Sequence, residues 1–232
     1  MGKKKKNILR FWIEALLLVA LVGAGIFIWW NTKTWQPERS EYPVQGLVTG
    51  EREGIVDLSA LRTARADFVY LEASSGADGR DATFGRNLAA LADTGIPHGA
   101  VHAYDPCIDA ERQAANFITI VPRDPGLLPP AIALDKLASE CGDPVIEAGI
   151  ESELTTFINQ VEGHAGQPVV LRVSPAFQER YAIASRIERN LWLESDWIEP
   201  DYAGRPWTLW TANSGIDNPT NGRPMRWVVV QN

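Results

Sequence analysis

The feature that most constrains this chain is an apolar stretch at residues 11–30, FWIEALLLVALVGAGIFIWW. About 20 such residues in a helix cross a hydrocarbon core of ~30 Å. The one ionisable residue, Glu14, lies near the start, where its side chain reaches the headgroups. Trp12, Trp29 and Trp30 lie at the two ends, as interfacial anchors do. The sequence therefore predicts a single membrane-spanning helix.

Charge predicts the orientation of this helix. Five basic residues precede it within residues 1–10, and positive segments stay in the cytoplasm. We therefore expect a basic cytoplasmic tail (1–10) and an outer domain on the periplasmic or extracellular face of the cytoplasmic (inner) membrane. A cleavable signal peptide is the alternative, but it needs a shorter apolar core and a small-x-small cleavage site. The bulky end of this stretch favours an uncleaved anchor.

The rest of the chain is acidic. The whole chain carries −7 and residues 1–40 carry +5, so residues 41–232 carry −12. Nucleic acids select basic surfaces, so a nucleic-acid partner is not expected. The two cysteines, Cys107 and Cys141, can pair if the domain lies in an oxidising compartment, or they can remain separate thiols. They do not form a metal box by themselves.

Apolar periodicity predicts an α/β fold. Residues 31–41 are polar and include Pro37, so we expect a short tether before a domain at 42–232. Strands are predicted at 44–48, 67–73, 99–104, 128–134, 168–173, 190–193, 207–210 and 227–230. Helices are predicted at 58–66, 83–93, 110–121 and 150–163. Open doubly wound sheets and closed barrels both fit this alternation. The late strands, with no predicted helix between them, favour an irregular TIM-like β/α barrel.

Several motifs occur in a characteristic order. They are VQGLV (44–48), GIVDLSAL (54–61), FVYLEASSG (68–76), DATFGRN (81–87), ADTGIPHGAVHA (92–103), QAANF (113–117), LPPAIALD (128–135), LWL (191–193) and WTLW (207–210). Together they resemble glycoside hydrolase family 25, the Chalaropsis-type lysozymes or N-acetylmuramidases, over residues 42–232. The resemblance implies an irregular β/α barrel that acts on peptidoglycan at the carboxyl ends of its strands.

The resemblance also implies which residues carry out the chemistry. Glycoside hydrolysis uses an acid and a second carboxylate. The family has an Asp on the first strand, an Asp-x-Glu after Pro-Pro and a further Asp near the C-terminus. These positions hold Val48, then Ala133 and Asp135, and finally Val229; an acidic second-strand position reads Ser75. Only Asp135 is a carboxylate, so it is the candidate acid of a degenerate site.

Asp135 is one methylene shorter than the Glu that it replaces. A misplacement of ~1 Å can cost on the order of 100-fold in rate, and we therefore predict that ordinary muramidase activity is lost or weak. Other carboxylates are available as replacements: Glu51, Glu53, Glu72, Glu194 and Asp196. The alternative is that these are solvated or paired with Arg52, Arg80 or Arg205.

Aromatic residues near the predicted strand ends are candidates for stacking on sugar rings. They are His102, Tyr104, Trp192, Trp207 and Trp210. For the tryptophans the alternative is core packing, and for His102 it is a structural hydrogen bond. No metal-ligand spacing and no cofactor motif occurs in the sequence.

Three functions remain open at this point. The favoured one is a membrane-anchored, lysozyme-like pseudoenzyme that binds peptidoglycan or a related glycan. The second is an active peptidoglycan glycosidase that uses Asp135 with relocated carboxylates. The third is a protein-interaction scaffold in the cell envelope, with a partner that the sequence does not identify.

Overall fold

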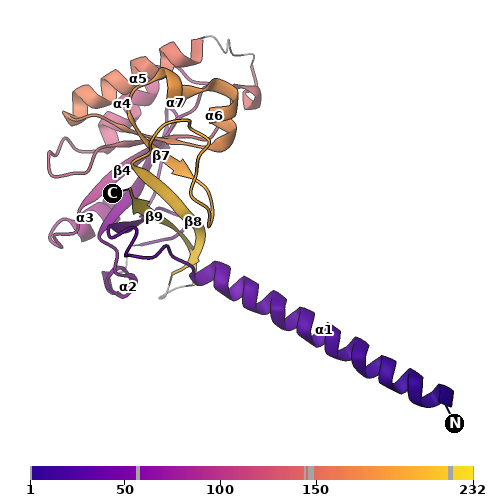
Figure 1. Ribbon diagram of the computed structural model, residues 1–232. Helices are drawn as coiled ribbons and strands as arrows, with labels where there is room; N and C mark the ends of the chain where they lie inside the picture. The colour runs from indigo at the N-terminus through magenta and orange to yellow at the C-terminus, as the bar shows by residue number, and fades with distance from the viewer. Residues whose placement is uncertain (1, 56–57, 144, 146–148, 219–221, 232) are drawn as a thin grey trace. The chain divides into compact units, whose positions relative to one another are not determined.

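The computed structural model describes residues 2–55, 58–143, 145, 149–218 and 222–231. The chain forms two compact units, Met1–Trp35 and Gln36–Asn232. The first unit is one helix, α1 (Gly2–Thr34), whose apolar part Phe11–Thr34 has a mean hydropathy of 2.4 (Figure 1). The predicted single apolar helix is confirmed, and it continues to Thr34. Its length and composition qualify it as a candidate membrane span, although a signal sequence would meet the same criteria.

The second unit is built on a closed barrel. Its strands are β1 (Gln45–Thr49), β2 (Phe68–Ser75), β3 (Gly79–Arg80), β4 (His98–Ala103), β5 (Ala131–Leu134), β6 (Val170–Val173), β7 (Asn190–Glu194), β8 (Leu209–Asp217) and β9 (Pro224–Val230). In the described residues they pair in the order β1-β9-β8-β7-β6-β5-β4-β2, and β1 pairs with β2 to close the ring. Strand β9 is antiparallel to both neighbours, and β3 forms a short antiparallel pair with β2. The predicted irregular β/α barrel is therefore confirmed.

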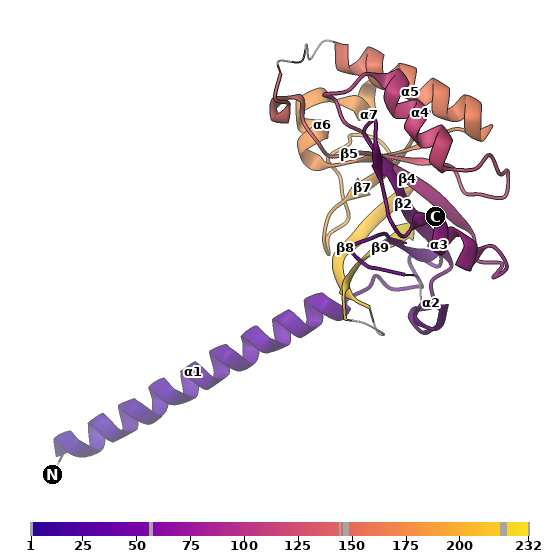
Figure 2. The same cartoon turned by 180° about the vertical axis from the view of Figure 1, so that it is seen from behind.

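Helices cover the outside of the barrel (Figure 2). They are α2 (Leu58–Ala64), α3 (Phe84–Leu91), α4 (Ala110–Ile120), the 3₁₀ turn η1 (Ala138–Glu140), α5 (Ile150–Ala165), α6 (Pro175–Tyr181) and α7 (Ile183–Arg186). Helices α4 and α5 lie side by side. The inner face of α5 buries Leu154, Phe157, Ile158 and Val161, as its periodicity predicts. Helices α6 and α7, between β6 and β7, were not predicted.

The interior of the barrel is apolar at its base and polar at its mouth. Side chains alternate along each strand, so every second residue points inward. The buried inner cluster includes Val48, Tyr70, Ala133, Trp192 and Val228. Two residues further toward the carboxyl ends of β2, β5, β6 and β7, the corresponding positions hold the charged residues Glu72, Asp135, Arg172 and Glu194. The charged residues at the mouth of the barrel therefore lie directly above a buried apolar cluster.

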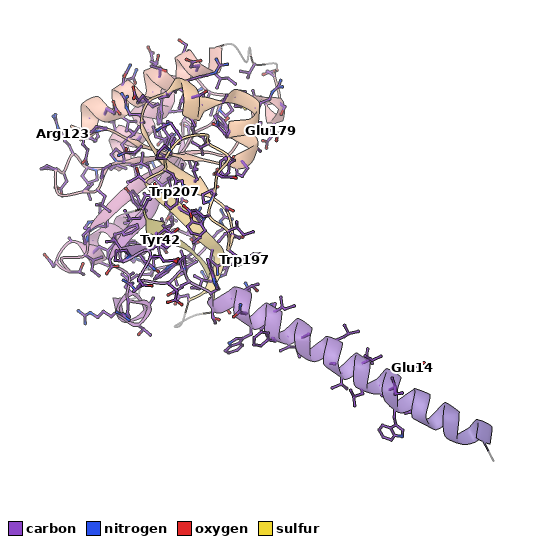
Figure 3. All side chains as sticks on the ribbon, viewed as in Figure 1. Glu14, Tyr42, Arg123, Glu179, Trp197 and Trp207 are labelled. Carbon is purple, nitrogen blue, oxygen red and sulfur yellow. A yellow bond between two sulfur atoms is a disulfide. The ribbon has the colours of Figure 1, made fainter. Side chains whose placement is uncertain are left out.

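The predicted tether is shorter in the structure. Pro37 is buried, and its carbonyl accepts a 3.0 Å hydrogen bond from the buried Gln45. Arg39 forms an ion pair of 2.8 Å with Asp67. The ring of Tyr42 stacks on Trp207 at 6.3 Å (Figure 3). We call residues 37–44 the docked segment, since they pack on the base of the barrel.

A disulfide bond joins two loops at the mouth. Cys107 follows β4 and Cys141 follows η1, and their Cα atoms are 5.4 Å apart. This resolves the choice that the sequence left open in favour of pairing. The bond ties the loop after β4 to the loop after β5, which begins with Asp135.

Candidate functional site at the mouth of the barrel

A cleft of about 650 Å³ opens at the carboxyl ends of the parallel strands. It is lined by the loop after β1, the ends of β2 and β4, the β3 strand, Asp135 after β5, and arginines from β6 and β9. Active sites of β/α barrels lie at this end, where loops from successive strands converge. A second hollow of about 360 Å³ adjoins it and shares Ser75, Ala103 and Asp135 with it.

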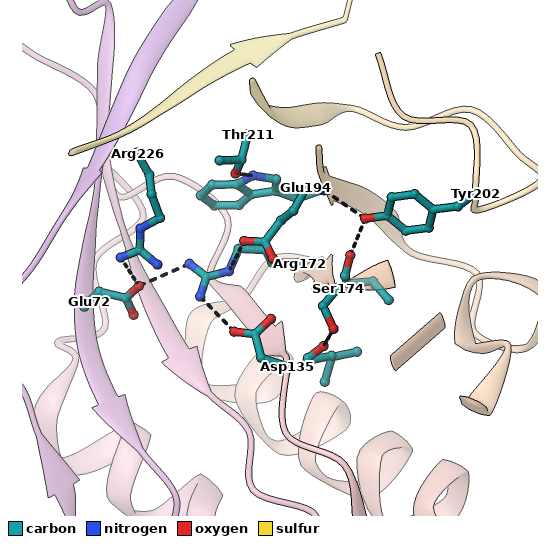
Figure 4. A network of polar contacts seen from close by, with 11 residues as sticks. Glu72, Asp135, Arg172, Ser174, Glu194, Tyr202, Thr211 and Arg226 are labelled. Carbon is teal, nitrogen blue, oxygen red and sulfur yellow. Dashed lines mark hydrogen bonds and ion pairs between the residues drawn. The ribbon is translucent and has the colours of Figure 1, made fainter. Parts of the chain in front are cut away.

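The floor of the cleft is organised around one buried guanidinium, that of Arg172 on β6 (Figure 4). It lies 3.1 Å from the Glu72 carboxylate, 3.3 Å from Asp135 and 3.4 Å from Glu194. Arg226 on β9 approaches the same Glu72 oxygen to 2.6 Å. Three carboxylates from β2, β5 and β7 therefore share one cation.

The network is held in place from below and from the side. The guanidinium of Arg172 lies 5.6 Å from the centre of the Trp192 ring, and Trp192 donates a 2.8 Å hydrogen bond to Thr211. The Tyr202 hydroxyl donates to the Val173 carbonyl and accepts from the Glu194 amide. The Arg172 Nε atom is buried with no hydrogen-bond partner among the described residues, because Glu194 approaches it only as an ion pair. Ion pairs, hydrogen bonds and ring packing therefore join the side chains of the floor to one another.

These contacts separate the acidities of two carboxyl groups. Burial alone would raise the pKa of Glu72, but the charges of Arg172 and Arg226 outweigh it and lower that pKa. For Glu194, burial comes first and raises the pKa, and the negative Asp135 adds to the rise against the opposing charge of Arg172. Glu72 therefore stays ionised, whereas Glu194 holds its proton more tightly than an ordinary Glu.

The predicted degenerate positions lie at two different places. Val48 and Ala133 point into the barrel and belong to the buried cluster below the cleft, with 0% and 1% exposure, and Ala133 also borders the adjoining hollow. Val229 pairs with Gln45 and Trp210 at the base, and it alternates outward because Val228 points inward. Placing Val229 at the mouth is therefore wrong. The residue of β9 that lines the cleft is Arg226.

Asp135 is the one predicted catalytic residue that lies in the cleft. Its side chain is 49% exposed and paired with Arg172. It also borders the adjoining hollow, so it stands between the two spaces. The position is suitable for a group that contacts a bound glycan, but its proton acceptor atoms face a permanent cation.

The predicted sugar-stacking residues do not line the main cleft. Trp192 is 0% exposed beneath Arg172. His102 is buried on the outer side, where it bonds Ser74 at 2.8 Å and contacts the ring of Phe157. Burial lowers the pKa of His102 to about 4. Tyr104 also packs on Phe157, and only its edge reaches the adjoining hollow.

Trp207 and Trp210 lie at the opposite end of the barrel. Trp210 pairs with Leu193 and Val229 near the start of β8, and its indole donates to the Ser195 carbonyl. Both rings are buried against Tyr42 of the docked segment. Trp207 and Trp210 therefore pack in the interior of the protein, which was the alternative to sugar stacking.

Of the remaining carboxylates, Glu51 is exposed, whereas Glu53 and Asp196 have structural partners other than the expected arginines. Glu53 accepts a bond from the Gly50 amide, and Asp196 accepts two from Ser214. Arg205, which was expected to pair with one of the candidate carboxylates, donates its hydrogen bonds to backbone carbonyls instead. Sequence reasoning missed Arg172 and Arg226. A charged residue within the apolar run 169–173 was the available signal, because arginine is almost never fully buried unless it is paired.

The fold and the cleft define a β/α-barrel domain of the glycoside hydrolase type. The profile of Glycosyl hydrolases family 25 matches residues 50–215, and the chain belongs to this family. No curated protein matches the sequence.

Solved structures share the fold at low sequence identity. A family 25 glycosyl hydrolase from Bacillus anthracis is 24% identical with a TM-score of 0.77, over 86% of this chain and 93% of that one. The bacterial lysozyme from Streptomyces coelicolor is 18% identical (TM-score 0.69; 82% and 92% covered). The spore cortex lytic enzyme SleM from Clostridium perfringens is 19% identical (TM-score 0.68; 84% and 69% covered).

Proposed function

We propose that this protein is a membrane-anchored, peptidoglycan-binding member of family 25 whose muramidase activity is lost or weak. Arg172 carries the argument. Glycosidic cleavage passes through an oxocarbenium-like, positively charged state that a carboxylate stabilises. Here a buried guanidinium stands at the centre of the floor, and its pKa is raised further by Glu72, Glu194 and Asp135 against the opposing effect of burial. The carboxylates that could stabilise such a state are therefore already paired with this guanidinium.

Each carboxylate of the floor is already paired with an arginine. Glu72 is shared between two arginines, and Asp135 is paired with Arg172. Losing general acid catalysis outright costs typically 100- to 10,000-fold. Together with the cation on the floor, this supports a binding domain rather than an efficient hydrolase.

An active glycosidase is the second candidate, and one observation favours it. The raised pKa of Glu194 and the lowered pKa of Glu72 resemble the divided roles of acid and base in hydrolases. In this version Glu194 or Asp135 would protonate the leaving oxygen. A protein-interaction scaffold is the third candidate.

The anchor is part of the proposal. We place α1 across the cytoplasmic membrane with its N-terminus inside and the barrel outside, supported by its hydropathy and the basic residues before it. The disulfide supports an outer location, because such bonds persist in oxidising compartments.

Full-length protein in detergent micelles, incubated with purified sacculi, tests the function. We expect it to sediment with the sacculi and to release no reducing ends above background. Asp135→Asn should leave sedimentation within about twofold, since the half-exposed Asp135 is only one of three carboxylates that contact Arg172. The matched control is Asp93→Asn, an exposed acid outside the cleft.

Two results would contradict the proposal. Release of reducing ends that Asp135→Asn abolishes and Asp93→Asn does not would establish the glycosidase. Failure of the wild-type protein to sediment would leave the scaffold hypothesis.

A further inference from the structure

Arginines gather in the cleft although the domain is acidic. The lining includes Arg52, Arg80, Arg172, Arg223 and Arg226. Residues 41–232 carry a net charge of −12, so arginines in one cleft are a local departure from the charge of the domain. Five acidic residues also line the cleft, and their own contacts decide what charge a ligand meets.

Most of these acids are already engaged by the protein. The Glu53 carboxylate accepts the Gly50 amide at 2.8 Å. Asp81 accepts the amides of Glu51 and Thr83 and the Thr83 hydroxyl. Glu72 faces two arginines at once. A carboxylate whose oxygens already accept hydrogen bonds from the protein is less available to a ligand than a free carboxylate is.

Two of the arginines are in the opposite situation. Arg52, in the loop after β1, and Arg80, in β3, are both exposed. In the described part of the chain, neither guanidinium has a polar partner. Arg223 instead donates to the Arg52 carbonyl at 3.4 Å and holds that loop beside the hairpin of β8 and β9. The rim therefore presents two unpaired cations and the exposed Glu51, above a floor in which Glu72 and Asp135 are each paired with an arginine.

We propose that this cleft binds an anionic group, a carboxylate or a phosphate carried on an envelope glycan, through Arg52 and Arg80. The inference rests on the proposed glycan-binding function and specifies the chemistry of its ligand. Guanidinium groups donate paired hydrogen bonds to either anion. A cleft of about 650 Å³ holds a substituted sugar. Repulsion from the acidic domain is screened beyond ~8 Å at physiological salt, whereas direct contact persists.

The test compares a rim variant with a charge-matched control in the full-length protein. Arg52→Gln combined with Arg80→Gln removes two charges from the cleft. Arg86→Gln combined with Arg123→Gln removes two from exposed positions outside it. Circular dichroism and thermal melts verify that both variants fold. We expect the rim variant to bind sacculi about tenfold more weakly and the control within about twofold.

Chemically treated sacculi identify the anion. One sample has its phosphodiester-linked polymers removed with hydrofluoric acid, and another has its carboxyl groups converted to neutral amides. Loss of binding to the amidated sample identifies a carboxylate, and loss with the first sample identifies a phosphate. Either result supports the proposal.

The failures of the two proposals differ. Equal binding of both variants and of all three sacculus samples would overturn the anion site while leaving the glycan-binding function intact. Absence of binding by the wild-type protein to untreated sacculi would overturn both.

Discussion

At the scale of single residues, the floor of the cleft depends on Arg172. Its side chain is 4% exposed and contacts three carboxylates. Removing one partner of a buried charge pair leaves the other charges uncompensated, which costs about 3–5 kcal/mol. Arg172→Met should therefore lower the free energy of unfolding by about that amount, measured by chemical denaturation followed by tryptophan fluorescence.

The matched control for Arg172 is Arg186→Met. Arg186 pairs with Glu151 at 2.9 Å, but both side chains are about half exposed. Exposed pairs contribute less than about 1 kcal/mol. Equal losses in the two variants would mean that the Arg172 network does not stabilise the fold.

His102 gives the fold an acid sensitivity that can be measured. Burial lowers its pKa from 6.5 to about 4, so the native state takes up this proton later than the unfolded chain does. The contribution of His102 to the free energy of unfolding is fully present above pH 6.5. It is lost as the pH falls toward 4, by up to about 3 kcal/mol. His102→Gln should flatten the unfolding free energy over this window.

Other groups contribute to the same pH profile. The raised pKa of Glu194 acts with the opposite sign, and the lowered pKa of Glu72 removes stability only at more acidic pH. Both remain in His102→Gln, so the difference between the two profiles isolates the histidine. Identical slopes between pH 6.5 and 4 would contradict the assignment.

Residue positions were predictable on some strands and not on others. Val48, Ala133 and Asp135 lie on inward-facing rows of β1 and β5, because order and spacing of motifs locate these strands well. Val229 was misplaced because β9 runs antiparallel to its neighbours. The first residues of β9, not its last, therefore lie at the mouth of the barrel. The ion-pair partners of Arg172 come from other strands of the barrel. The sequence around Arg172 therefore does not identify them.

At the scale of elements, the disulfide stabilises the mouth. It closes a loop with a sequence separation of 34 residues, which in a chain-entropy estimate is worth about 4 kcal/mol. Cys107→Ser with Cys141→Ser should lower the melting temperature by about 10 °C. An unchanged melting temperature would show that the loop after β5 is held by its other contacts, such as the 2.7 Å pair of Lys136 with Asp105.

The predicted strands and the four predicted helices coincide with observed elements, most of them with ends shifted by a few residues, but β8 extends to Asp217, seven residues beyond its predicted end, and β3 was not predicted. Helix α6 was missed although Ser174 caps it and Pro175 occupies its first turn, a recognisable start signal. Closure into a ring could not be predicted from alternation alone, because open and closed sheets share that pattern. Closure depends on β9 bridging β8 and β1.

At the scale of the whole molecule, the anchor and the disulfide make one joint prediction. If α1 is uncleaved and the barrel lies outside, full-length protein remains in the membrane pellet after alkaline carbonate washing. In the same sample, Cys107 and Cys141 resist alkylation until a reductant is added. A soluble form that begins after residue 30 would instead identify a signal peptide.

The docked segment restricts where such a protein can work. Only Trp35 and Gln36 separate Thr34, the last residue of α1, from the buried Pro37. Fully extended, three residue steps span about 11 Å. If α1 spans a bilayer, this link is too short for the barrel to reach the outer layers of a cell wall. It would then meet only those glycan strands that pass close to the lipid surface.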